Sequence, residues 1–403
     1  EAAGPARERR PSTGPRADSR VDLHFDIAQM QLSKHGEELC GDSVHRVDTP
    51  YGVIVALSDG LGSGVKANIL SSLTVTLATK MLEKGARLDD VVEALGETLP
   101  VCRVRKLAYS TFSLLLLSRE GRAYLAEYDN PPAFIGRGGR LVDVPRHGRD
   151  IHGRVVREAA FEVADGSWIA LVSDGVLHAG IGGLWNLGWG WERVGAYLEK
   201  LGGADIDAAD FVREIEHLVQ RLYAGKPGDD ATAVIVRVRR PRLLTALIGP
   251  PRSRSDDAEV TRQLMASPGW KVVCGGTTGN MVARVLGREI EVDLAFPDER
   301  VPPTGRLEGV DLLTEGTLTL HRCLELLRSG VRPRQLEGRR DGASRLASML
   351  LRADRLDFII GRAINPAHQS PDVPPDLAIK HKVVEDIVAE LEARGKKVSV
   401  KYY

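Results

Sequence analysis

Residues 51–64 read YGVIVALSDGLGSG, and this stretch decides the fold of the first part of the chain. Its first half, Tyr51–Ser58, is an almost unbroken apolar run, which predicts a buried β-strand. The strand ends in Asp59-Gly60. The next segment, Ser63–Lys84, carries apolar residues three and four positions apart, as an amphipathic helix does. The stretch therefore predicts a strand that places an aspartate at its end, followed directly by a long helix.

The sequence on either side, residues 21–240, predicts a β-rich domain with a few helices. A second buried strand, Trp168–Ser173, ends in the same way at Asp174-Gly175. The other predicted strands are 21–31, 110–118, 121–129, 132–136 and 231–238, and the other predicted helices are 88–95, 191–201 and 208–223. Strands of this kind with pairs of long helices predict sheets sandwiched between helices.

The remaining residues, 241–403, follow a different rhythm. Predicted strands alternate with predicted helices, which indicates βαβ units and a smaller α/β domain with a mostly parallel sheet. The strands are expected at 243–248, 270–274, 310–313, 356–360 and 398–402, and the helices at 257–265, 278–286, 317–328, 343–351 and 377–393. We therefore expect two domains, 21–240 and 241–403. Residues 1–20, rich in Arg, Pro, Ala and Gly, are expected to form a flexible tail.

Bulk composition argues against several classes of protein. The chain has 403 residues, 43% hydrophobic and 27% charged, which is ordinary for a globular protein. Lys+Arg and Asp+Glu number 55 each, so no charge excess indicates nucleic acid as a partner. No apolar run approaches the roughly 20 residues of a membrane span. The 4 scattered cysteines favour a reducing, cytoplasmic setting. Because the chain begins at Glu1 rather than Met, we expect a trimmed chain or a piece of a longer protein.

Four aspartates share one context, since each stands beside glycine at a predicted strand end. They are Asp42, Asp59, Asp174 and Asp229. A single Asp-Gly pair would be interpreted as a β-turn. Carboxylates that converge on one site, however, repel each other unless cations neutralise them. Oxygen ligands suit Mg²⁺ or Mn²⁺, and two such ions can clamp a phosphoryl group and activate a bridging water. We therefore expect two Mn²⁺ or Mg²⁺ ions and phosphate-ester hydrolysis without a protein nucleophile.

These segments resemble the motifs of a known family. The matching stretches are Cys40-Gly41-Asp42-Ser43, Ser58–Gly64, Asp129–Phe134, Ser173-Asp174-Gly175 and Gly228–Thr232. In order and spacing they are similar to the metal-dependent protein phosphatases (PPM, type 2C), and within them to the bacterial SpoIIE/RsbU-like branch. The resemblance covers residues 21–240. It implies an αββα sandwich with the site at one end of the two sheets.

The resemblance also implies roles for single residues. Asp59 would bridge both metals, and the Gly60 carbonyl would be a further ligand. Asp42 would contribute through its carboxylate or through bound water, and Asp174 and Asp229 would hold the other metal. The implied reaction is hydrolysis of phosphoserine or phosphothreonine in a partner protein, often an antagonist of an anti-sigma factor.

Two further features follow from this likeness. The helix Ser63–Lys84 would take the place of the family's regulatory helix, and a homodimer would form there. Eukaryotic members have a phosphate-binding arginine ahead of the first acidic motif. Here Gln31–Leu39 offers only Lys34 and His35, so the substrate phosphate would rely mostly on the metals.

Three polar residues near the motifs leave alternatives open. His45 and His178 could each act as a general acid, although a structural or surface role is the favoured interpretation. Asp230 is an extra acid in the last motif, and we rank it below Asp229.

The second domain carries a Gly/Thr-rich loop between a predicted strand and a predicted helix. Its residues are Gly275, Gly276, Thr277, Thr278, Gly279 and Asn280. Such a loop presents N–H groups to a small anionic ligand, although a helix cap without a ligand explains it equally well. With the loops at 314–317 and 364–368 it would line one crevice at the carboxyl ends of the strands. We expect a ligand-sensing or docking domain that controls the phosphatase.

The sequence therefore predicts a cytoplasmic Mn²⁺/Mg²⁺-dependent protein serine/threonine phosphatase with an appended α/β domain. Two alternatives remain. The fold could serve partner binding without catalysis, against which the presence of all four aspartates argues. The substrate could instead be a small phosphorylated metabolite.

Overall fold

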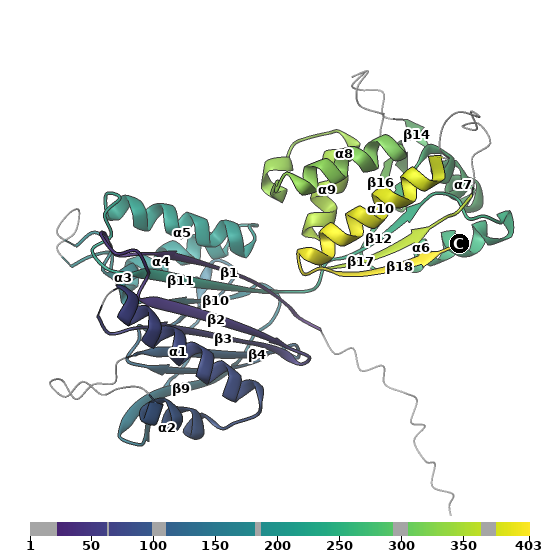
Figure 1. The fold of residues 1–403 in the computed structure, drawn as a ribbon. Helices are drawn as coiled ribbons and strands as arrows, with labels where there is room; N and C mark the ends of the chain where they lie inside the picture. Colours follow the sequence, from purple (N-terminus) through teal and green to yellow (C-terminus); the bar gives the residue numbers. More distant parts are fainter. Residues whose placement is uncertain (1–21, 63, 99–109, 182–186, 293–304, 364–375) are drawn as a thin grey trace, which may run out of the picture. The chain divides into compact units, whose positions relative to one another are not determined.

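The structure is a computed structural model that describes residues 22–62, 64–98, 110–181, 187–292, 305–363 and 376–403 (Figure 1). The predicted tail at 1–20 and the loop 364–368 lie outside these residues. Contacts between Cα atoms divide the chain into two compact units, Glu1–Arg240 and Pro241–Tyr403. No helix within the described ranges is long and apolar enough to cross a membrane.

The first unit contains two antiparallel sheets. A 6-stranded sheet has the order β2-β3-β4-β5-β9-β8, and a 5-stranded sheet has the order β1-β11-β10-β6-β7. The strands of the first are β2 (Asp42–Thr49), β3 (Gly52–Asp59), β4 (Phe112–Ser118), β5 (Arg122–Tyr128), β8 (His147–Ile151) and β9 (Arg154–Glu162). Those of the second are β1 (His24–Leu32), β6 (Phe134–Arg137), β7 (Arg140–Leu141), β10 (Ser167–Val172) and β11 (Ala231–Arg239).

Side chains that alternate along the central strands join the two sheets face to face. On β3, Val55 and Leu57 lie in the core between the sheets, where they share one cluster with Leu171 of β10 and Val236 of β11. The residue between them, Ala56, points to the opposite face and packs against helices. Because successive strand residues face opposite sides, a fully apolar strand such as β3 needs a cover on both faces.

Helices supply that cover on the outside of each sheet (Figure 1). The helices α1 (Gly64–Glu83) and α2 (Leu88–Thr98) share a core cluster with β3 and β4. The helices α4 (Trp191–Gly202) and α5 (Ala208–Leu222) share another with β10 and β11. The layers are therefore α, β, β and α, which confirms the αββα sandwich.

Helix α1 exists as predicted, but only part of its apolar stripe is buried. Leu70 belongs to the core, and the other buried residues include small or polar ones such as Ala67, Ser71 and Ala78. Val65 and Ile69 are 58% and 59% exposed. The small face is required because the helix lies directly against the backbone of β2 and β3, where a Ser43 Oγ–Ser71 Oγ hydrogen bond of 2.7 Å joins the two elements.

The second unit is a mixed, mostly parallel sheet between helices. Its strands are β12 (Leu243–Ile248), β13 (Trp270–Cys274), β14 (Glu291–Val292), β15 (Gly305–Leu307), β16 (Val310–Thr314), β17 (Arg355–Ile360) and β18 (Lys397–Tyr402). The order is β14-β15-β16-β13-β12-β17-β18, and the last five run parallel. The α/β prediction is confirmed. The antiparallel β14 and β15 were not anticipated, because both are very short.

Among the described residues, five α-helices cover this sheet. They are α6 (Asp257–Ala266), α7 (Gly276–Leu286), α8 (Thr317–Arg328), α9 (Gly342–Arg352) and α10 (Asp376–Ala393). The residues of α8, α9 and α10 share one core cluster, and those of α6 and α7 another. On β12, Ala246 belongs to the first cluster and Leu247 to the second, so the two helix groups cover opposite faces.

Candidate metal centre

The two sheets of the first unit each bring two aspartates to a strand end. In the 6-stranded sheet, β2 begins at Asp42 and β3 ends at Asp59, and these two residues lie directly opposite in the antiparallel register. In the 5-stranded sheet, β10 ends just before Asp174 and β11 begins just after Asp229. All four motifs thus stand where the backbone is held by a ladder of hydrogen bonds.

The four carboxylates converge on one site, as their effect on Asp59 shows. Burial, followed by the charges of Asp42, Asp174, Asp229 and Asp230, raises the pKa of Asp59 from 3.8 to about 8. Like charges shift a pKa in this way only at short range. The ends of the two sheets therefore meet in a single cluster of acids.

Asp42 is the most deeply buried acid of this cluster. It is 1% exposed, and neither carboxylate oxygen has a hydrogen-bond partner in the described part of the chain. Burial raises its pKa to about 7, while the Ser173 and Thr232 hydroxyls lie near enough to oppose the rise. A buried charge without a partner costs several kcal/mol. A cation is the group that would remove this cost, so the residues present fit a metal site.

Asp174, Asp229 and His178 lie close together. One ligand atom from each of the three residues lies within 4.8 Å of the other two. The pKa of Asp174 is raised by burial and then by the charge of Asp229, whereas His178 opposes the rise. Carboxylate oxygens and an imidazole nitrogen at this spacing are a ligand set for one divalent ion.

Gly60 follows Asp59 at a place where the backbone of α1 comes very close. A Cβ atom on Gly60 would lie 2.1 Å from the carbonyl oxygen of Ala67 in α1. The Gly60 N–H donates to the carbonyl of Gly41, 3.3 Å away. A Cβ on Gly41 would itself lie 2.7 Å from Asp230 Oδ2. Glycine is thus required at both motifs because backbone and carboxylates pack without room for a side chain.

Asp230 belongs to the acid cluster more closely than its sequence rank suggested. It is 5% exposed, and its charge acts on both Asp42 and Asp59. Its Oδ1 accepts the backbone N–H of Lys34, 2.9 Å away. Asp229 in turn accepts the N–H of Asp230, 3.0 Å away. Asp230 therefore ties the segment before β2 to the site, and this bond uses the backbone of Lys34, not its side chain.

The two histidines weighed in the sequence differ in position. His45 Nδ1 forms a 2.7 Å hydrogen bond with Thr79 Oγ1 of α1, which agrees with the structural interpretation. His178 instead lies beside Asp174 and Asp229. Its side chain is 49% exposed, and the sequence indicated that it lies near the third motif but did not predict it as a metal ligand.

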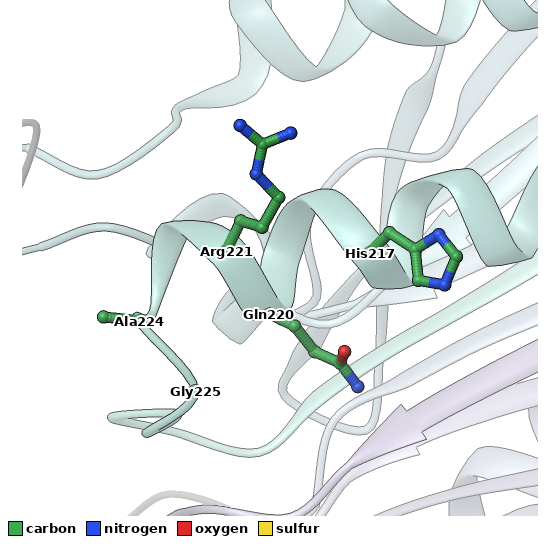
Figure 2. A pocket seen from close by; sticks show the side chains of 5 residues that line it. All are labelled: His217, Gln220, Arg221, Ala224 and Gly225. Atoms are coloured by element: carbon green, nitrogen blue, oxygen red, sulfur yellow. The ribbon is translucent and has the colours of Figure 1, made fainter.

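A pocket unrelated to the sequence predictions lies at the carboxyl end of α5. Figure 2 shows its lining, which is His217, Gln220, Arg221, Ala224 and Gly225. None of these residues belongs to the acid cluster. The carboxyl end of a helix disfavours anions, which opposes the charge of Arg221. We assign no chemistry to this pocket.

In the second unit, the Gly/Thr-rich loop 275–280 does stand between a strand and a helix. Gly275 follows β13 with φ of 111°, and its N–H donates to the carbonyl of Thr314, 2.9 Å away. The loops after β13 and β16 are therefore in contact. A Cβ on Gly276 would lie 3.5 Å from Glu315 Oε1. A carboxylate already faces the start of α7, and it would repel a second anion.

The topology of this sheet also points away from the predicted loop. From β12 the chain adds β13 and β16 on one side, and then returns to add β17 and β18 on the other side of β12. The succession of strands across the sheet therefore reverses between β12 and β17. Ligands of open parallel sheets gather at such a reversal. The loop 275–280 follows β13 instead, so an anionic ligand there stays a prediction without support from the strand order.

Comparison with known proteins agrees with the geometry of the first unit. Residues 49–239 match the family model of stage II sporulation protein E (SpoIIE). The protein of that name from Bacillus subtilis (strain 168) is 26% identical over 217 residues, which are 51% of this chain and 25% of the relative. Residues 49–239 form a SpoIIE-like domain.

Other relatives match the SpoIIE-like domain over similar or shorter stretches. Stage II sporulation protein E of Priestia megaterium is 25% identical over 121 residues, 30% of this chain and 20% of the relative. The chain thus spans a quarter or less of the length of these relatives. A crystal structure of the B. subtilis SpoIIE phosphatase domain without domain swapping is 21% identical, with a TM-score of 0.41, and covers 55% of this chain and 94% of that one. A second, with a fragment of the regulatory domain, is 22% identical, with a TM-score of 0.46, and covers 54% and 62%.

Proposed function

We propose that this chain is a Mn²⁺- or Mg²⁺-dependent phosphatase that hydrolyses phosphoserine or phosphothreonine in a partner protein. The observation that carries the proposal is Asp42, a carboxylate 1% exposed and without a hydrogen-bond partner in the described residues, set among other acids. A folded chain tolerates such a group when a divalent cation neutralises it. The SpoIIE-like match over residues 49–239 adds the reaction class.

The residues that would hold two ions are the four aspartates and one backbone group. Asp59 and Asp42 come from the 6-stranded sheet, and Asp174 and Asp229 from segments next to β10 and β11 of the other sheet, with the Gly60 carbonyl as a fifth ligand. The ions would supply Lewis acidity toward the phosphoryl group and activate water for attack on it. The chain's own part is rigidity: ligands at strand ends keep their spacing, and burial strengthens every charge interaction at the site.

The test is hydrolysis of p-nitrophenyl phosphate with and without Mn²⁺. We expect Asp59→Asn and Asp174→Asn to lower kcat roughly a hundredfold or more, the scale of losing one strong electrostatic contact to a transition state. The matched control is Asp48→Asn, an aspartate on the same strand as Asp42 that is 60% exposed and paired with Arg46. Equal rates in wild type and both site variants would remove the enzymatic proposal and leave the partner-binding alternative.

The substrate class needs a separate experiment. Phosphoserine and phosphothreonine peptides are compared with small phosphorylated metabolites at equal concentration. The proposal requires a higher kcat/KM for the peptides, whereas a preference for a metabolite would favour the alternative. By family likeness alone, we propose an antagonist of an anti-sigma factor as the partner, and the cytoplasm as the setting.

The remaining proposals concern assembly and control. The exposed apolar residues Val65, Ile69 and Leu73 on α1 support a homodimer through this helix, which sedimentation of wild type and Ile69→Glu would test. We also propose that the second unit controls the phosphatase through a ligand, for which a change in kcat on addition of a nucleotide or acidic metabolite is the measurement.

A further inference from the structure

We propose that His178 is a third protein ligand of the ion held by Asp174 and Asp229, and that it shifts the preference of this ion site from Mg²⁺ toward transition metals. The inference rests on the proposed metal site but adds a residue that the four-aspartate motif does not contain. Its basis is the grouping of Asp174, His178 and Asp229, in which one ligand atom per residue lies within 4.8 Å of the others.

The distances suit one shared ion. Two ligands about 2.1 Å from an ion are separated by about 3.0 Å when adjacent and about 4.2 Å when opposite. His178 Nδ1 lies 3.9 Å from Asp174 Oδ2, inside this interval. The largest spacing in the group, up to 4.8 Å, closes with a side-chain shift of roughly half an ångström.

One turn of helix brings the first two ligands together. Asp174 is the first residue of the short helix α3 (Asp174–Leu177), and His178 is its C-cap. The N–H of His178 donates to the carbonyl of Asp174, 2.9 Å away. Residues four apart on a helical turn project from the same side. This spacing is the one that paired metal ligands use when they come from a single helix.

The backbone under His178 is fixed by the glycine-rich segment that follows. A Cβ on Gly188 would lie 2.8 Å from the carbonyl oxygen of Leu177 and 2.9 Å from the Cα of His178. The N–H of Gly190 donates to the same Leu177 carbonyl, 2.8 Å away. These backbone contacts fix the turn that carries the imidazole, and a metal ligand requires such support.

The third ligand, Asp229, belongs to the last motif, and this motif contacts α3. A Cβ on Gly175 would lie 2.0 Å from the carbonyl oxygen of Asp230. The Tyr223 hydroxyl donates to the carbonyl of Gly175, 2.6 Å away. These contacts lock α3 against the Asp229 segment, so the three ligands share one frame.

An independent observation supports a cation at this site. Asp42 is buried without a hydrogen-bond partner within the described ranges, and the charge of Asp174 is one of those that raise its pKa. A protonated His178 paired only with Asp174 would be a half-exposed ion pair, worth about 0–1 kcal/mol. That pair would leave Asp42 uncompensated, whereas an ion beside Asp174 would not.

Imidazole nitrogen discriminates between metals. It suits Mn²⁺, Fe²⁺, Co²⁺ and Zn²⁺ better than Mg²⁺, which prefers oxygen. Loss of a strong ligand should therefore lower the affinity for Mn²⁺ or Co²⁺ about tenfold or more, while the affinity for Mg²⁺ changes about twofold or less. The ratio of the two dissociation constants is the quantity that His178 would set.

The experiment uses the full chain loaded with Mn²⁺ and reads coordination directly. Electron spin-echo envelope modulation detects ¹⁴N on the ion, and calorimetric titration gives Kd for Mn²⁺ and for Mg²⁺. The variant is His178→Gln. The matched control is His152→Gln, because His152 also lies 3.9 Å from a carboxylate, Glu93, and is 50% exposed against 49% for His178. His152 has no third ligand nearby among the residues that the structure describes.

The expected result is a ¹⁴N signal in wild type and H152Q that disappears in H178Q, together with a tenfold or larger rise in the Kd for Mn²⁺. Mn²⁺ bound to wild type without ¹⁴N coupling would overturn this inference and leave the proposed phosphatase intact. A signal that survives in H178Q would overturn it equally. No Mn²⁺ binding at all would overturn both.

Discussion

At the scale of single residues, the Asp42 carboxylate should lower the stability of the metal-free protein although metal binding needs it. It is buried, charged above its pKa of about 7, and surrounded by other acids. Without metal the charge is uncompensated, so Asp42→Asn should raise the free energy of unfolding of the metal-free protein by roughly 1–2 kcal/mol. The same change should abolish most of the stabilisation by Mn²⁺, because an amide is a weak ligand. Thermal unfolding in EDTA and in Mn²⁺ measures both.

The control for this prediction is Asp48→Asn at the other end of β2, where the side chain is 60% exposed. It should change neither the stability in EDTA nor the gain from Mn²⁺ by more than about 0.5 kcal/mol. A D42N protein that is less stable than wild type in EDTA would show that the Asp42 carboxylate is compensated without a cation.

The raised pKa values predict the pH dependence of the metal-free protein. Asp42 and Asp59 have folded pKa values of about 7 and about 8 against 3.8 when unfolded. Between about pH 4 and pH 8 the folded state therefore binds more protons than the unfolded state, and stability falls as pH rises through this window. The stabilisation by these groups is present at low pH and is lost above their folded pKa values.

Urea unfolding in EDTA at pH 5.5 and pH 8.5 is the measurement, with a D42N/D59N double variant to subtract other titrating groups. Wild type should lose more stability than the double variant over this interval. With saturating Mn²⁺ the trend should weaken or reverse, since the metal competes with the protons. Parallel pH profiles in EDTA for the two proteins would contradict the prediction.

At the scale of secondary-structure elements, Gly60 is the position at which the backbone of α1 packs directly against the metal site. A Cβ at Gly60 would meet the Ala67 carbonyl at 2.1 Å, and backbone cannot rotate away as a side chain does. Gly60→Ala should therefore displace the start of α1, cost about 1–3 kcal/mol of stability and weaken Mn²⁺ binding. Chemical denaturation and calorimetric titration give the two quantities.

Gly228→Ala is the matched control, since Gly228 precedes Asp229 but a Cβ there would touch only Tyr223 Cε1 at 3.7 Å, an ordinary contact. This variant should keep both stability and metal affinity close to wild type. If Gly60→Ala behaves in the same way, α1 is free to move without disturbing the site.

The strands that the sequence predicts differ in burial from the strands that it does not predict. Strands β3 and β10 are apolar on both faces, so their runs stand out from the chain. Strand β2 reads DSVHRVDT and is covered on one face by polar contacts with α1, and β9 lies near the edge with mixed residues. Neither has the periodicity by which a strand is recognised. Their pairing depends on neighbours distant in sequence.

The same limit applies to the site. Asp42, Asp59, Asp174 and Asp229 could be singled out because each stands beside glycine, and the structure brings them together. His178 was singled out only as a candidate general acid near the third motif, and a role as metal ligand was not predicted, since α3 has only 4 residues and shows no repeat. A histidine four positions after the third motif aspartate is the one sequence feature that could have indicated it.

At the scale of the whole molecule, the two units have separate hydrophobic cores. The clusters around the two sheets of the first unit and those around the parallel sheet of the second share no residue in the described part of the chain. Units with their own cores unfold independently unless a large interface couples them. Because the acid cluster belongs wholly to the first unit, Mn²⁺ should act on only one of two transitions.

Differential scanning calorimetry of the full chain tests this directly. We expect two transitions, of which one rises with Mn²⁺ concentration by the usual linkage, about 2.7 kcal/mol at a hundredfold excess over Kd. Asp174→Asn assigns the shifted transition to the first unit if it abolishes the shift and leaves the other transition in place. A single transition that moves as a whole would instead show that the second unit is coupled to the metal site. Control by a ligand of the second unit could then act through folding itself, without a separate conformational switch.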